Sequence, residues 1–130
     1  MEKEKILIIE DDEDTRLYLT YFIGKKFYIH LYNSSDFYYK FNESVNYDLI
    51  ILDLSIKNKI EGEQIIKKIK SSESFRKIPL ICISAQTSLE EKENILALGA
   101  DEFMLKPVAN EKLMKAILAH LYKAAKTNHK

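Results

Sequence analysis

The sequence has little cysteine, no net charge of either sign and no long hydrophobic run. Its 130 residues include one cysteine, Cys82, which excludes an internal disulfide bond and a zinc site built from several cysteines. No hydrophobic stretch approaches the roughly 18 residues that a membrane span requires. The charged first residues do not form a signal peptide. We therefore expect a cytoplasmic protein that does not contact a membrane.

The charge balance also argues against one class of partner. The 20 basic and 20 acidic residues cancel to a formal net charge of zero. Proteins that bind nucleic acid through its phosphates are usually basic, so we expect no direct DNA binding by this chain. The charges are unevenly placed: residues 1–65 carry 13 acids and 8 bases, whereas residues 66–130 carry 7 acids and 12 bases. The acidic residues are concentrated near the start of the chain.

Short hydrophobic runs alternate with longer helical patterns along the chain. Strands are predicted over residues 6–9, 28–32, 49–52, 80–83 and 103–105. Helices are predicted from near Asp14 to Gly24, after Ser34-Ser35, from Gly62 to Ser71, from Ser88 to Gly99, and after Asn110. Three strands are apolar throughout, which is typical of a parallel sheet covered on both faces. The pattern predicts a single α/β doubly wound domain, with a polar tail that frays from about Lys123.

Polar residues follow four of the predicted strands. The first is followed by five consecutive acids at 10–14, and the others by Asp53, Ser84 and Lys106. The carboxyl ends of parallel strands lie at one edge of a sheet, where ligands bind. Each of these residues has an ordinary structural explanation when taken alone, such as a helix cap for Asp53 or a solvated charge for Lys106. Their common position at the strand ends favours a shared site.

The loop after the first strand lacks the glycines of a nucleotide-binding turn. Its five acids repel a free phosphate and attract a cation, because two carboxylates about 4 Å apart repel by roughly 4 kcal/mol near a protein surface. Oxygen ligands without His or Cys favour Mg²⁺, with Mn²⁺ or Ca²⁺ possible. The preference of a helix start for negative charge explains only one or two of these acids, such as Glu13 and Asp14.

Four stretches resemble the receiver domain of response regulators in two-component signalling. They are ILIIEDD at 6–12, LIILDL at 49–54, PLICISA at 79–85 and LGADEFMLKP at 98–107. The similarity extends from residue 5 to about 123. It implies a flavodoxin-like (βα)5 fold, with a five-stranded parallel sheet in the order 2-1-3-4-5 flanked by five helices.

The resemblance assigns a role to each polar position. It implies that Asp53 is the phosphoacceptor. It also implies that Mg²⁺ is held by Asp11 directly, by Glu10 through water, by Asp53 and by the backbone carbonyl of Ser55. We place the acidic pair at 10 and 11 because Arg16 lies five residues after the second acid, as is common in the family.

Further positions match residues that respond to the phosphoryl group. Ser84 and Lys106 match the hydroxyl and the amine that contact it, and Phe103 occupies the position of a switch aromatic. Ser55 and Gln86 match the positions that tune dephosphorylation in the family.

The resemblance also implies partners. A sensor histidine kinase or a histidine phosphotransfer protein would supply the phosphoryl group. A downstream protein would read the result on a surface of the fourth helix, fifth strand and fifth helix. We expect a monomer or a phosphorylation-dependent dimer. The chain modifies only itself, so we do not expect an enzyme. A receiver fold uses about 120 residues, so we expect no output domain in these 130.

Two alternatives remain. Lys57 stands where the family usually has proline, and Gly62 is nine residues after Asp53 rather than eight. These departures keep open a degenerate receiver that acts only as an unphosphorylated interaction module. A phosphatase of the haloacid dehalogenase type would use Asp12 as its nucleophile, but that motif requires Thr or Val where Arg16 stands.

Overall fold

The computed structural model shows a five-stranded parallel sheet. It describes residues 3–54, 61–85 and 88–128. The strands lie side by side in the order β2-β1-β3-β4-β5, and every neighbouring pair is parallel. Their bounds are β1 Lys5–Ile9, β2 Tyr28–Tyr32, β3 Leu49–Leu54, β4 Leu80–Ser84 and β5 Glu102–Leu105. The predicted strand order and the α/β doubly wound class are confirmed.

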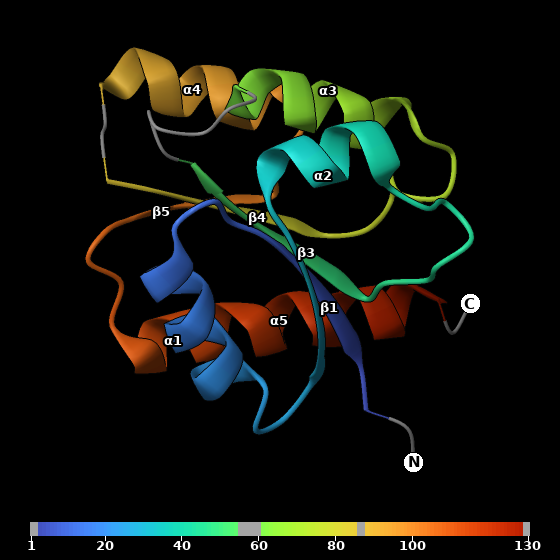
Figure 1. Cartoon of the computed structure of the whole chain (residues 1–130), viewed down its shortest axis with the longest axis vertical. Helices are drawn as coiled ribbons and strands as arrows, with labels where there is room; N and C mark the ends of the chain where they lie inside the picture. Colours follow the sequence, from blue (N-terminus) through green and yellow to red (C-terminus); the bar gives the residue numbers. More distant parts are fainter. Residues whose placement is uncertain (1–2, 55–60, 86–87, 129–130) are drawn as a thin grey trace.

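Within the described residues, four helices connect the strands, a fifth follows β5, and together they cover both faces of the sheet. They are α1 Glu13–Ile23, α2 Ser34–Lys40, α3 Gly62–Ser71, α4 Leu89–Leu98 and α5 Asn110–Asn128. Figure 1 shows α1 and α5 on one side of the sheet, and α2, α3 and α4 on the other. This covering explains why three strands are hydrophobic on both sides.

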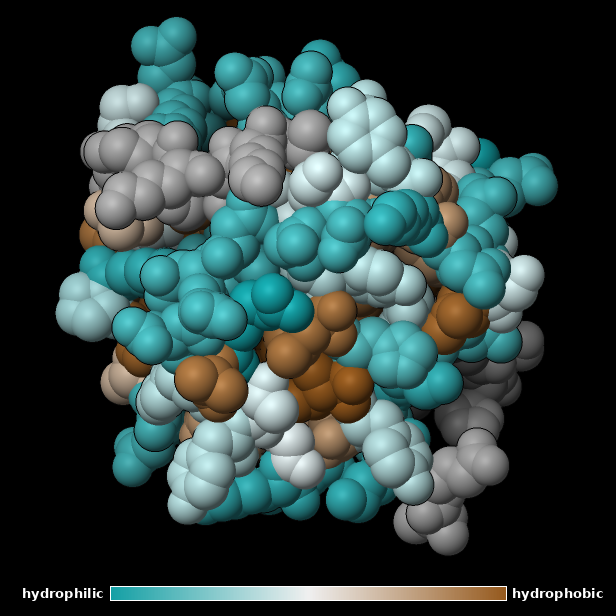
Figure 2. All heavy atoms as spheres, in the orientation of Figure 1, coloured by the Kyte–Doolittle hydropathy of each residue, from teal (hydrophilic) through white to brown (hydrophobic). Residues whose placement is uncertain are grey.

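The two faces of the sheet form two hydrophobic cores. Alternate residues of each strand point to opposite faces. Ile8 of β1 and Ile51 of β3 belong to the core beneath α1 and α5. Leu7 and Ile50 belong to the core beneath α2, α3 and α4. Hydrophilic side chains cover most of the face seen in Figure 2, with hydrophobic ones gathered near its centre. No described helix is both long and apolar enough to cross a membrane.

Two site residues lie inside strands rather than after them. Residues 49–52 were predicted as the third strand, but β3 continues through Asp53 to Leu54 because both residues pair with β4. Ser84 is likewise the last residue of β4. The sheet backbone therefore fixes Asp53 and Ser84 directly.

The helix ends follow local capping interactions. The side chain of Asp12 caps α1 by accepting a hydrogen bond from the Thr15 backbone N–H at 2.9 Å. Asn33 caps α2, so α2 begins at Ser34, earlier than predicted. The side chain of Ser88 caps α4, as its capping-box pattern predicts. Helix α5 continues to Asn128, and the fraying expected from about Lys123 stays a prediction.

Helix α1 forms where predicted, but its buried side differs from the spacing that predicted it. The sequence pattern paired Leu17 with Tyr21 and Tyr18 with Phe22. The fully buried residues are instead Leu19 and Ile23, whereas Leu17 and Tyr21 are 69% and 71% exposed. Hydrophobic residues occur on several sides of this helix, so periodicity alone could not identify the side that faces the sheet.

Candidate functional site

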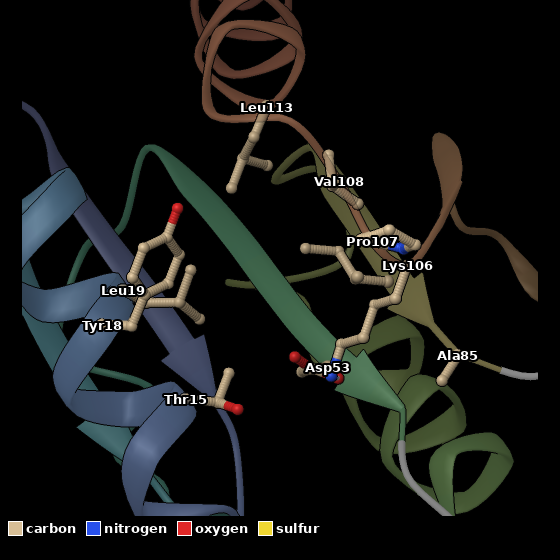
Figure 3. A pocket seen from close by; sticks show the side chains of 10 residues that line it. Thr15, Tyr18, Leu19, Asp53, Ala85, Lys106, Pro107, Val108 and Leu113 are labelled. Carbon is tan, nitrogen blue, oxygen red and sulfur yellow. The ribbon is translucent and has the colours of Figure 1, made fainter.

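Three charged residues meet where β1, β3 and β5 end. Glu10 follows β1 and continues its pairing, since its backbone N–H donates to the carbonyl of Tyr32 at 3.0 Å. Asp53 comes two residues after Ile51 in β3, so both side chains point to the face of the sheet that α1 and α5 cover. Lys106 comes from the turn after β5. Figure 3 shows its side chain extending from that turn down to Asp53.

Asp53 and Lys106 form a close ion pair. The Nζ atom of Lys106 lies 2.8 Å from Oδ1 of Asp53. The Asp53 side chain is 1% exposed, whereas that of Lys106 is 32% exposed. The partly exposed ammonium group of Lys106 therefore contacts a buried carboxylate. This arrangement stabilises negative charge at one point of the sheet edge.

Glu10 lies beside this pair and is also buried, at 1% exposure. Its Oε1 accepts a hydrogen bond from the backbone N–H of Asp12 at 3.1 Å. Its Oε2 is buried without a hydrogen bond from any group that the structure describes. Burial, together with the neighbouring Asp53 carboxyl, raises the pKa of Glu10 to about 8. Glu10 therefore retains a proton near neutral pH unless a cation replaces it.

Burial also raises the pKa of Asp53, while Lys106 acts in the opposite direction. The single positive charge of Lys106 thus acts on both the Glu10 and the Asp53 carboxyl groups. When both carboxyls are ionised, two negative charges face one amine, and one negative charge is left in excess. A divalent cation would resolve this excess.

A cavity of about 490 Å³ opens next to Asp53. Its polar end holds Asp53 and Lys106, and its walls come from α1 and the turn before α5 (Figure 3). Tyr18 and Leu19 line one side, and Val108 lines the other. The peptide bond between Lys106 and Pro107 is cis. The Asp53 carboxylate thus lies at the polar end of a partly hydrophobic cavity.

Ser84 and Phe103 lie on the other face of the sheet from Asp53. Ser84 is buried at the end of β4, and its carbonyl accepts a hydrogen bond from the Lys106 backbone N–H at 2.8 Å. Phe103 pairs with Cys82 in the β4–β5 register and packs, partly buried, against the core beneath α4. Both residues occupy neighbouring strands. Ser55, Lys57 and Gln86 lie outside the described residues.

The Asp11 carboxylate is hydrogen-bonded by Ser34, and its role as a direct Mg²⁺ ligand stays a prediction. Its Oδ1 accepts a hydrogen bond from the backbone N–H of Ser34 at 2.5 Å, and its Oδ2 accepts one from the Ser34 hydroxyl at 2.7 Å. Ser34 was not among the predicted residues of this region. The only signal was a serine pair near a predicted helix start, because the contact joins residues 23 positions apart.

The oxygen ligands of this site suit a hard divalent cation, although the predicted carboxylate ligands that the structure describes do not surround a common point. Glu10 and Asp53 supply carboxylate oxygens, and Oε2 of Glu10 is buried without a hydrogen-bond donor from the described part of the chain. Mg²⁺ prefers oxygen ligands of this kind. Among the described residues, however, no three acidic, histidine or cysteine side chains already surround a common metal position. Asp11 follows Glu10 in the sequence, but its carboxylate is hydrogen-bonded to Ser34.

Comparison with known proteins gives a consistent result. A family model described as response regulator receiver domain matches residues 6–118. The transcriptional regulatory protein CusR of Escherichia coli K12 is 30% identical over 122 residues, which cover 93% of this chain and 52% of CusR. The chain therefore spans about half the length of such curated relatives.

Solved structures share the fold. The chemotaxis protein CheY4 of Vibrio cholerae superimposes with a TM-score of 0.80 at 20% identity, covering 90% of this chain and 98% of CheY4. The receiver domain of the sensor histidine kinase PA1611 from Pseudomonas aeruginosa gives 0.81 at 20% identity, covering 92% and 98%. That second structure is described with a magnesium ion coordinated in its active site cleft.

Proposed function

The chain belongs to the family of response regulator receiver domains, and we propose that it accepts a phosphoryl group on Asp53 in a Mg²⁺-dependent reaction. The observation that carries this proposal is the buried Asp53 carboxylate, paired at 2.8 Å with Lys106 and lying beside Glu10. A purely structural aspartate would not require a second buried carboxyl with an unsatisfied oxygen.

In the proposed reaction, an oxygen of Asp53 attacks the phosphorus of a phosphohistidine. The P–N bond breaks, a P–O bond to Asp53 forms, and the histidine keeps the bonding electrons and takes up a proton. Phosphoryl transfer depends mainly on positioning and on neutralisation of charge. Lys106 neutralises charge at the acceptor, and β3 fixes the acceptor's position. Mg²⁺, held by Glu10, Asp11, Asp53 and the Ser55 carbonyl, would offset negative charge on the phosphoryl oxygens.

The phosphorylated state would then be read through the protein's surface. Ser84 and Phe103 lie on the neighbouring strands β4 and β5, and β5 contacts α4. We propose that Ser84 moves to the phosphoryl group and that Phe103 turns inward, which changes the surface of α4, β5 and α5. The donor would be a sensor histidine kinase or a histidine phosphotransfer protein, and the target a downstream protein.

The protein itself is the substrate of this reaction, so we propose a signalling module in the cytoplasm rather than an enzyme. Ser55 and Gln86 remain predicted modulators of the lifetime of the phosphorylated state. The oligomeric state in signalling is proposed to be a monomer or a phosphorylation-dependent dimer.

The test is phosphorylation by a small donor. We expect incubation with acetyl phosphate and Mg²⁺ to add one phosphoryl group, measured by intact mass spectrometry. Asp53→Asn should abolish the addition. Asp36→Asn, at an exposed aspartate of α2, should leave it unchanged. A lack of labelling by acetyl phosphate and by histidine kinases would favour the degenerate receiver, which acts only by binding.

A further inference from the structure

Asp11 is held by a residue that the proposed reaction does not use. Ser34 donates its backbone N–H to Oδ1 of Asp11 and its hydroxyl to Oδ2. Ser34 is fully buried, at 0% exposure, and is the first residue of α2. Both oxygens of the carboxylate are therefore engaged by one serine. Hydrogen bonds to an ionised acceptor are stronger than those between neutral groups.

The sheet explains why Ser34 reaches Asp11 but not Glu10. Glu10 continues the β1 ladder, and its carboxyl lies with Asp53. The next residue in an extended chain points to the opposite face. The opposite face is covered by α2, α3 and α4, and α2 begins at Ser34 (Figure 1). In the strand order, β2 and β3 flank β1 on opposite sides. Asp11 is thus drawn toward the end of β2, whereas Asp53 lies on β3.

This placement conflicts with direct binding of a cation by Asp11. The proposed function has Asp11 bind the cation together with Glu10 and Asp53, but Ser34 engages both oxygens of the Asp11 carboxylate. We propose that Ser34 competes with the divalent cation for Asp11, so that metal binding at the phosphorylation site must release at least one Ser34 hydrogen bond. This inference rests on the proposed function. It makes Ser34 a positioning residue that lowers the affinity of the site for Mg²⁺ and couples metal binding to the start of α2.

The hydroxyl of Ser34 can be removed without removing the cap of α2. That cap is provided by Asn33, whose Oδ1 accepts a hydrogen bond from the Asp36 backbone N–H at 2.7 Å. Ser34→Ala deletes one of the two bonds to Asp11 and leaves the backbone N–H in place. The variant therefore weakens the competing interaction while the helix start keeps its own support.

The test measures Mg²⁺ binding to the unphosphorylated protein by isothermal titration calorimetry, with Mn²⁺ binding by electron paramagnetic resonance as a second readout. We expect Ser34→Ala to lower the Kd about tenfold, which corresponds to the loss of one charge-assisted hydrogen bond. Ser35→Ala, one residue further along α2, should bind like the wild type. Ser34→Thr keeps a hydroxyl and should restore a Kd close to that of the wild type.

A double-mutant cycle distinguishes competition from a general change in the fold. In the background of Asp11→Asn, which lacks the anionic ligand, Ser34→Ala should no longer lower the Kd. A Kd that is unchanged or raised in Ser34→Ala would overturn the competition, as would an equal effect with and without Asp11. Failure of the wild type to bind Mg²⁺ at all would instead contradict the proposed function on which the inference rests.

Discussion

The carboxyl groups of Asp53 and Glu10 are buried beside each other, and one partly exposed lysine, Lys106, pairs with Asp53. Removing a carboxylate from water costs free energy, and a second carboxylate nearby adds repulsion. Lys106 compensates only in part, since burial raises the pKa of Asp53 despite the lysine. The site is therefore a place where the protein gives up stability, as functional sites often do.

Asp53→Asn should for this reason stabilise the protein. The substitution keeps the size of the side chain and removes the buried negative charge of Asp53. We expect the free energy of unfolding at neutral pH to rise by about 1–2 kcal/mol, measured by urea denaturation without metal. Asp36→Asn, at an exposed position, should change it by less than about 0.5 kcal/mol. A clear loss of stability in Asp53→Asn would show that the ion pair with Lys106 outweighs the burial cost.

Glu10 should make stability depend on pH. Its pKa rises from 4.5 to about 8 on folding, because burial and Asp53 disfavour its charged form. The folded state then binds a proton that the unfolded state has released, so this contribution to stability is complete below pH 4.5 and lost as the pH rises through about 8. Relative to wild type, Glu10→Gln should gain stability steadily across this window in pH-dependent urea unfolding. A constant difference across the window would contradict the shifted pKa.

At the level of elements, the sequence predicted helix α1, but packing against the sheet determines which of its side chains are buried. Leu19 is 3% exposed and packs beneath the helix, whereas Leu17, two residues earlier, is 69% exposed. We expect Leu19→Ala to lower the free energy of unfolding by about 2–4 kcal/mol, because it removes buried methyl groups and leaves a cavity. Leu17→Ala should change it by less than about 0.5 kcal/mol. Similar losses in thermal or urea unfolding of both variants would contradict the observed orientation of α1.

The strands were predictable because their residues are hydrophobic on both faces of the sheet. Runs such as 49–52 are hydrophobic throughout, which only a covered parallel sheet requires. Helix α3 was predicted with its observed bounds, since Ile65, Ile66 and Ile69 define one side clearly. The convergence of Glu10, Asp53 and Lys106 followed from the rule that parallel strands end at one edge.

Other features depend on contacts that no local pattern reports. The buried side of α1 depends on how the helix docks on the sheet. The position of the Asp11 carboxylate depends on Ser34, which comes from a different loop. Asp53 lies inside β3 because β4 pairs with it, and that pairing partner is distant in sequence.

At the scale of the whole molecule, the doubly wound sheet gathers the uneven charges of the sequence. Its topology brings acids from the first half of the chain to Lys106 from the second half. A net charge of zero thus conceals an acidic edge that a basic side chain and a cation can jointly neutralise.

Metal binding to this edge should stabilise the entire fold. A ligand that binds only the folded state, present at 100 times its Kd, adds about 2.7 kcal/mol to the free energy of unfolding. We expect Mg²⁺ to raise the Tm of the wild type, and to raise that of Asp53→Asn much less. NaCl at matched ionic strength provides the control for general screening. An equal Mg²⁺ effect in both proteins would place the cation elsewhere.

The most direct measurement locates the phosphoryl group within the chain. The protein is phosphorylated with acetyl phosphate and Mg²⁺, reduced with borohydride, digested and sequenced by mass spectrometry. Borohydride converts an aspartyl phosphate to homoserine and leaves free carboxylates unchanged. We predict homoserine at position 53 alone. Homoserine at Asp11 or Asp12, or its absence from a protein that is phosphorylated, would contradict the assignment of Asp53 as the acceptor.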